Sequence, residues 1–167
     1  SIEDTLYTFT GTNTKNAARR VKVDLLSLGN GRQNVGSSPA ASSIYLTAVP
    51  SDEQVELSWN DQTPWNNLRF DIFRRAEGEA QFDSIGSSTQ NSYVDVDLDN
   101  GTDYCYYIRS SGEYNVNSVI RPILNLSQEA CAIPIDNVPP CSPEFTLESD
   151  CDQGLMELKW NDISRTC

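Results

Sequence analysis

A sequence of eight residues recurs near the end of the chain. The first copy, at residues 54–61, reads QVELSWND, and the second, at residues 155–162, reads LMELKWND. At the same offset Ile44 and Leu46 fall on Phe145 and Leu147. A repeat of about 100 residues is the size of a domain, and tandem copies of such a module usually form an extended array. We therefore expect several modules, and a chain that is an excerpt of a longer protein.

The first forty residues match the second half of the repeated module. Residues 23–29 correspond to residues 106–112, with Val21 in place of Tyr104, so this copy is diverged. The sequence predicts the C-terminal half of one module, one complete module and the N-terminal part of a third, at residues 1–41, 42–136 and 137–167.

The composition is strongly acidic. Asp and Glu number 24 against 12 Lys and Arg, which gives a formal net charge of −12. Nucleic-acid binding needs a basic face, so we exclude it, whereas this charge is typical of a solvated, secreted surface. The sequence contains no run of 18 apolar residues, so we expect no membrane span in this segment.

Catalysis has little basis in this sequence. The chain has no histidine, so it cannot form a Ser-His or Cys-His pair or a typical zinc site. It also lacks a Gly-rich phosphate loop. We therefore predict no enzymatic activity, no catalytic residues and no cofactor.

The five cysteines point to an oxidising compartment. None forms a C-x-x-C pair, and we favour disulfides over metal binding or buried free thiols. Four can pair within the chain, and we expect the odd one, Cys167, to pair beyond it.

Short runs of alternating apolar residues predict an all-β fold. They are separated by turn clusters such as Asp99-Asn100-Gly101, and no window shows a helical apolar stripe. About seven strands in one module indicate a sandwich of two sheets. Leu98, the Gly101-Thr102 turn and Tyr104 also resemble a tyrosine corner, in which the hydroxyl bonds back to the upstream backbone. The alternative is a tyrosine that merely favours a strand.

The Trp-bearing strand, this corner and the period together resemble the fibronectin type III module. Four phrases resemble modules in very large proteins of gliding Bacteroidetes that end in a gliding-motility-associated C-terminal domain: residues 59–67, 100–106, 127–132 and 139–141. The resemblance implies immunoglobulin-like sandwiches in tandem. It also implies cargo of type IX secretion, exported to the cell surface or shed from it.

This fold would place Cys105 and Cys131 on the two neighbouring strands F and G. The resemblance therefore implies a Cys105–Cys131 disulfide, because β-carbons on paired strands approach closely enough for the bond. It also implies a Cys141–Cys151 disulfide that pins the start of the third module.

Three aspartates form a weak candidate for a calcium site. Asp95, Asp97 and Asp99 precede Gly101, but the run fails the EF-hand register. The simpler interpretation is a solvated sheet edge and turn.

Trp65 and Tyr114 are candidate contacts with a ligand or with the preceding module. Trp65 lies in the loop between strands B and C, and Tyr114 in the loop between F and G, at the same end of the module. Packing across the module junction is the simpler interpretation, and the apolar F–G segment suggests a hairpin covering that junction. Thr5 and Ser84 match an O-glycosylation pattern, whereas the sequons at Asn100 and Asn125 would be silent in a bacterium.

We expect a non-catalytic stalk of tandem modules in a large secreted surface protein, serving adhesion or gliding. Its expected partners are neighbouring modules, with surface or secretion-system proteins or glycans as further candidates. The alternatives are spacer modules of a secreted hydrolase and a protein- or glycan-binding module. A module's fold alone does not decide among these roles.

Overall fold

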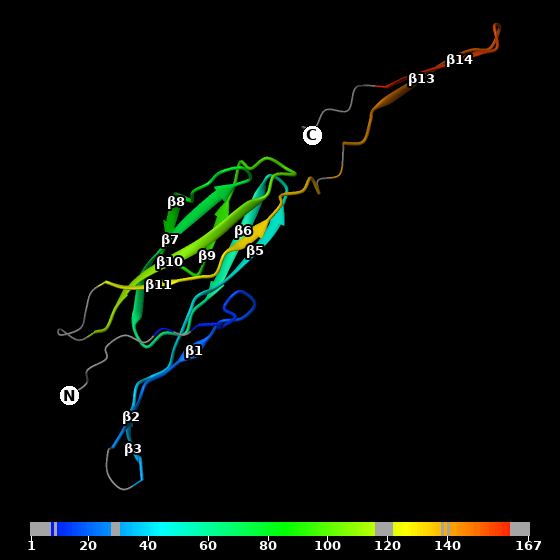
Figure 1. Cartoon of the computed structure of the whole chain (residues 1–167). Coiled ribbons are helices and arrows are strands. Elements are labelled where there is room, and N and C mark those ends of the chain that lie inside the picture. Colours follow the sequence, from blue (N-terminus) through cyan, green and yellow to red (C-terminus); the bar gives the residue numbers. More distant parts are fainter. Residues whose placement is uncertain are drawn as a thin grey trace. The chain divides into compact units, whose positions relative to one another are not determined.

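The computed structural model describes residues 8, 10–27, 31–115, 122–137, 139 and 141–160. All regular secondary structure in these ranges is β-strand (Figure 1), so the all-β prediction is confirmed. No helix in the described residues is long and apolar enough to cross a membrane. The chain divides into two compact units, Ser1–Asp136 and Asn137–Cys167.

Two antiparallel sheets form the centre of the first unit. One sheet has the order β5-β6-β9; in the other the order is β11-β10-β7-β8, and β12 also pairs with β10. Their bounds are β5 Tyr45–Ser51, β6 Gln54–Asn60, β7 Asn66–Ala76, β8 Asp83–Ser88, β9 Ser92–Asp95, β10 Tyr104–Glu113, β11 Ile123–Leu126 and β12 Ala130–Ala132. Buried residues of both sheets form one core, which makes this region sandwich-like.

Alternation along the strands explains which side chains enter this core. Every second residue of a strand faces the same side, so β6 buries Val55, Leu57 and Trp59. The other sheet contributes the longest alternating strand, β10, and Phe70 of β7 packs edge-on against Trp59 with ring centroids 5.2 Å apart. The core consists of Ile44, Leu46, Val55, Leu57, Trp59, Phe70, Ile72, Leu98, Tyr104, Tyr106, Ile108 and Ala132.

The predicted tyrosine corner is present. Tyr104 and Leu98 are both buried, and the Tyr104 hydroxyl accepts a hydrogen bond of 3.2 Å from the backbone N–H of Asp99. This bond ties the start of β10 to the segment that arrives from the opposite sheet.

One edge between the sheets is closed by the side chain of Gln128. Its Nε2 donates to the backbone carbonyl of Leu46 (2.6 Å), and its Oε1 accepts from the Leu46 N–H (3.1 Å). The amide thus takes the place of a neighbouring strand and satisfies two backbone groups that an edge strand would leave open.

The segment before β5 forms two short ladders. The strands are β1 Arg20–Val21, β2 Asp24–Leu26, β3 Asn34–Ser37 and β4 Ala41–Ser42. β1 pairs with β4 and β2 with β3. Most of their side chains are exposed, so this segment adds little to the core of the unit.

The described residues of the second unit form a hairpin of β13 (Phe145–Asp150) and β14 (Leu155–Trp160). Trp160 pairs with Phe145, whereas its counterpart Trp59 pairs with Leu46. Phe145 therefore corresponds in the ladder to Leu46 and not to Ile44, as the constant offset suggested. The reason is the longer turn of four residues between Asp150 and Leu155. A shift of two residues keeps each side chain on its face.

One face of this hairpin is apolar. Cross-strand pairing places Phe145, Leu147, Met156, Leu158 and Trp160 together, and all five are more than half exposed. The opposite face carries Lys159, whose ammonium lies 3.0 Å from Glu148 and 3.5 Å from Glu157.

Of the two predicted disulfides, one is present and one is wrong. Cys105 of β10 is bonded to Cys131 of β12, its direct partner in the ladder. Cys141 also takes part in a disulfide, but Cys151 is a free, exposed thiol, so a Cys141–Cys151 bond does not form. The physical reason is that Cys151 begins the turn beyond β13 while Cys141 precedes that strand. A six-residue strand spans roughly 20 Å, far beyond the reach of a disulfide. Cys167 lies outside the described residues.

Candidate functional site

The three candidate calcium ligands do not form a site. Asp95 is buried, and its two carboxylate oxygens lie 3.1 and 2.9 Å from Nη1 of Arg74. Asp97 and Asp99 are exposed in the following turn, where Asp97 has φ 58°. The expectation of a solvated edge position is also wrong for Asp95, because it pairs with Val55 on the inner face of the sheet.

Arg74, Asp95 and Tyr106 form an ionic cluster between the sheets. The Tyr106 hydroxyl donates to Asp95 (2.9 Å), so one carboxylate receives bonds from β7 and β10 of the opposite sheet. Burial, together with the negative charge of Asp95, raises the pKa of Tyr106 well above its ordinary value. Burial opposes the charge of Arg74, but the bonds to Asp95 outweigh it and raise its pKa.

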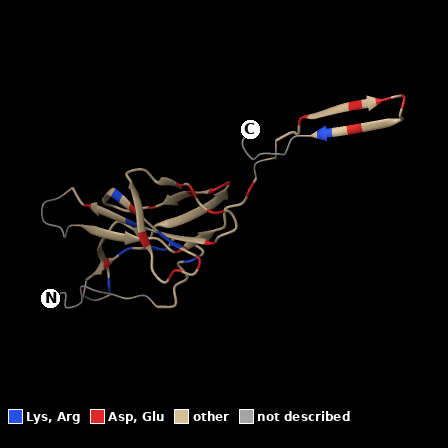
Figure 2. Cartoon of the chain, turned by 90° about the horizontal axis from the view of Figure 1, so that it is seen from above, with Lys and Arg blue, Asp and Glu red and all other residues tan. Residues whose placement is uncertain are grey.

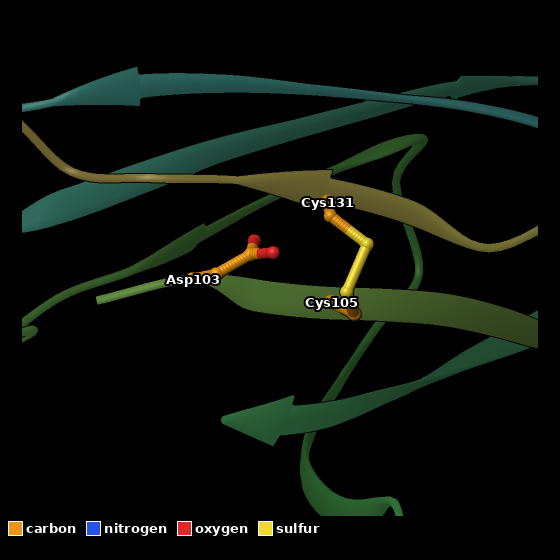
Figure 3. Close-up of side chains that lie close together, drawn as sticks. All are labelled: Asp103, Cys105 and Cys131. Carbon is orange, nitrogen blue, oxygen red and sulfur yellow. A yellow bond between two sulfur atoms is a disulfide. The ribbon is translucent and has the colours of Figure 1, made fainter. Parts of the chain in front are cut away.

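A second acidic group lies near the disulfide. Figure 3 shows Asp103 beside the bonded sulfurs of Cys105 and Cys131. Both thiols are consumed by the disulfide, so neither can serve as the thiolate that a metal requires. Asp103 alone therefore offers no metal site.

Aromatic and cationic side chains alternate on the outer face of the five-stranded sheet. Phe73 and Tyr107 stack with centroids 4.6 Å apart, and Phe82 meets Tyr107 edge-on at 4.9 Å. Arg109 lies over Phe73 at 5.0 Å and Arg75 over Phe82 at 4.7 Å. The ring faces are thus occupied by one another and by guanidinium groups, so this outer-face stack is built for packing rather than for stacking a ligand.

The guanidinium groups of this stack are themselves paired. Arg75 contacts Glu129 at 2.6 Å, and Arg109 and Arg69 both contact Asp71, at 3.0 and 2.6 Å. Burial disfavours the charged form of Asp71, but the hydrogen bonds from Arg109 and Arg69 prevail and lower its pKa. These charges are satisfied within the molecule.

Trp65 is half-buried at the end of the sandwich nearest the segment before β5. Its Nε1 donates to Oδ1 of Asn67 (3.0 Å), and its ring meets Tyr114 edge-on with centroids 5.9 Å apart. A β-carbon at Gly112 would lie 2.7 Å from the Trp65 ring, so only glycine permits this approach. The two aromatic candidates, Trp65 and Tyr114, are therefore brought together.

A cleft of about 600 Å³ lies beside Trp65. Its walls come from two regions far apart in sequence, the segment before β5 and the end of the sandwich, through Thr12, Thr14, Arg19, Arg20, Val21, Ala41, Ser42, Ser43, Trp65 and Asn125. Sequence reasoning identified only Trp65 as a contact here. Among the others only Asn125 belongs to a motif, a glycosylation sequon that does not predict the cleft, and it is separated from Arg20 by most of the chain.

The wall of this cleft is fixed by hydrogen bonds at Ser42. Its N–H donates to the carbonyl of Gln62 (2.7 Å), and its hydroxyl accepts from the Gln62 N–H (2.9 Å). Its carbonyl accepts from Nδ2 of Asn125 (2.9 Å). The segment before β5 is thereby attached to both the B–C loop and β11.

The remaining candidates concern modification. Ser84 is exposed on β8, and Thr5 lies outside the described residues. The side chain of Asn100 bonds to Asp52 and to the N–H of Glu53, and Asn125 bonds to Ser42. Both sequon asparagines thus have structural roles.

Outside the cleft, the distribution of charged residues does not mark a particular binding surface. Figure 2 shows acidic residues distributed widely along the ribbon, with fewer basic residues among them. Comparison with protein-family models and with curated protein sequences finds no match to this chain.

Proposed function

We propose that residues 42–136 are a fibronectin type III-like module. On this proposal the chain belongs to a non-catalytic stalk of tandem modules in a secreted surface protein, with adhesion or gliding as its role. The observation that carries the proposal is the recurrence of the module's hairpins on both sides of it.

The hairpin after the module repeats its beginning. β13 and β14 pair as β5 and β6 do, and both place a tryptophan on the apolar face of the second strand. In the module this face is covered by the five-stranded sheet, whereas Trp160 is 66% exposed. An isolated two-stranded ribbon is marginal in water, so such a hairpin is expected to belong to a larger sandwich.

The segment before the module resembles its end. In the module, β10 pairs first with β12 and further along with β11. The segment before β5 shows the same pattern. β1 pairs with β4, as the start of β10 pairs with β12, and β2 pairs with β3, as the end of β10 pairs with β11. This agreement supports a half-module at residues 1–41.

The type of sandwich is supported by its strand order and corner. The three-stranded sheet β5-β6-β9 faces a sheet in which β10, the sixth strand of the module, lies between β7, the third, and the last strands β11 and β12. The Tyr104 hydroxyl also bonds to the backbone where the chain crosses between the sheets. The Cys105–Cys131 disulfide supports an oxidising compartment, because such bonds persist outside the cytosol.

The module proposal is tested by the autonomy of residues 42–136. We expect the isolated fragment to unfold in one cooperative transition, with a midpoint close to that of the corresponding transition in the 167-residue chain. A fragment that fails to fold, while the whole chain folds, would contradict an independent module.

The surface location needs a separate test. Intact cells that make the protein would be treated with protease and probed with an antibody against residues 42–136. Cleavage without lysis is expected, and full protection until lysis would overturn the surface assignment.

A further inference from the structure

Two cations that have no acidic partner among the described residues line the cleft beside Trp65. Arg19 and Arg20 are exposed, and neither forms an ion pair with any residue that the structure describes. The Arg19 Nε donates to the carbonyl of Asn13 (2.8 Å), which holds the side chain while leaving its terminal nitrogens available. In contrast, Arg74, Arg75 and Arg109 are all paired.

Neutral polar residues line the same cleft as these two arginines. The hydroxyls of Thr12 and Thr14 form no hydrogen bond within the described part of the chain, and Ser43 accepts only the N–H of Arg19. Asn125 donates once to Ser42, and its Oδ1 accepts no hydrogen bond from the described residues. Such closely spaced hydroxyl and amide groups match a ligand rich in hydroxyls.

Trp65 supplies the apolar wall. Its indole N–H is already engaged by Asn67, so towards the cleft it offers ring surface rather than a donor. Tyr114 and Gly112 support the ring from the sandwich side. A fixed aromatic ring beside open polar groups suits the C–H face of a pyranose.

We propose that this cleft binds an acidic saccharide. Carboxylates of the saccharide are held by Arg19 and Arg20, its hydroxyl groups by Thr12, Thr14, Ser43 and Asn125, and a sugar ring packs on Trp65. Arg is suited to this role because its planar fork of donors matches a carboxylate. The proposal goes beyond the structural role proposed above and does not depend on it.

The net charge of the protein limits which anions can approach it. A chain of net charge −12 repels polyanions in general, so attraction to one requires a local exception. The two guanidinium groups in the cleft, which form no ion pair within the described residues, are such an exception. An acidic peptide would also use the charges, but it would leave the hydroxyl-rich wall without a matching partner.

The test is an NMR titration of the 167-residue chain with tetragalacturonic acid, compared with its fully methyl-esterified form. We expect shifts of the Trp65 indole N–H and of the Arg19, Arg20 and Asn125 amides with the acid, and much weaker binding of the neutral ester. The double variant Arg19→Gln/Arg20→Gln should bind the acid at least about tenfold more weakly. Arg32→Gln, which removes an exposed charge outside the cleft, should bind as the native chain does.

Trp65→Leu provides a second variant directed at the ring. We expect Trp65→Leu to weaken binding. The double arginine variant should keep the native thermal midpoint, since Arg19 and Arg20 are exposed. Equal binding of acid and ester, equal loss in Arg32→Gln and the double variant, or no shifts at the cleft would overturn the proposal. Arginine-dependent binding of tetraglutamate but not of the saccharide would also overturn it, because the site would then recognise an acidic peptide.

Discussion

Arg74 and Asp95 join the two sheets through an ion pair in which Asp95 is buried and Arg74 is partly buried, with Nη1 of the arginine 2.9 Å from the nearer carboxylate oxygen. Asp95 lies on β9 and Arg74 on β7, so the contact links one sheet to the other. Breaking such a pair leaves a charge inside the protein, which costs far more than the pair itself contributes.

Arg74→Met is therefore expected to lower the free energy of unfolding by about 2–3 kcal/mol, because Asp95 loses its charge partner. Urea denaturation measures the loss. Arg69→Met is the matched control, since Arg69 is largely exposed and should cost less than about 1 kcal/mol. Equal losses in the two variants would contradict a special role for the inter-sheet pair.

The raised pKa of Tyr106 predicts sensitivity to alkali. The folded state holds the phenolic proton above pH 10, whereas the unfolded chain releases it near its ordinary value of 10.0. This contribution is thus fully present below pH 10 and is lost as the pH rises towards the folded pKa. Tyr106→Phe should cost about 1–2 kcal/mol at pH 8 through the lost bond to Asp95.

Denaturation between pH 8 and 11 checks this expectation. The native chain should lose stability above pH 10 more steeply than Tyr106→Phe, so that the difference between them narrows. Parallel pH profiles of the two proteins would show that ionisation of Tyr106 does not contribute to the loss of stability.

The Cys105–Cys131 bond closes a loop of intermediate length. Replacing both cysteines by alanine should lower the free energy of unfolding by roughly 2–4 kcal/mol. Cys151→Ser is the control and should leave stability unchanged, because that thiol is free and exposed. Peptide mapping without reduction gives a direct check, and a Cys131–Cys141 bond would refute the observed pairing.

Gln128 offers a test of how the sheet edge is closed. Gln128→Met should cost about 1–3 kcal/mol, since the Leu46 N–H and carbonyl lose their partners. Hydrogen exchange at the Leu46 amide should become faster, whereas Gln90→Met, at an exposed position, should change neither quantity. Unaltered exchange at Leu46 would mean that the backbone groups find other partners.

Alternation and turn chemistry made the sheets predictable. A half-buried strand is predicted directly by the alternation of Val55, Leu57 and Trp59, and the corner by Leu98 with Tyr104. These signals are local, and packing in the structure agrees with them. The same rule failed at Asp95, because a charged residue at an inward position is recognisable only when its partner across the core is known.

The cleft and the second disulfide were beyond sequence reasoning for a related reason. Arg20 and Asn125 meet only through the folded chain, and no spacing predicts their proximity. Likewise, the distance between Cys141 and Cys151 is set by β13, which separates them along its length. The altered register of Phe145 depends on turn length, which a constant repeat offset conceals.

The disulfide between β10 and β12 has a mechanical consequence. It closes the chain between Cys105 and Cys131, a sequence separation of 26. If force pulls on the two ends of the module, this loop cannot lengthen even after the strands have come apart. On the order of 90 Å of extension is withheld, and the load passes directly from one cysteine to the other. A tether made of such units would yield less length per rupture than its residue count implies, and reducing conditions would release the remainder.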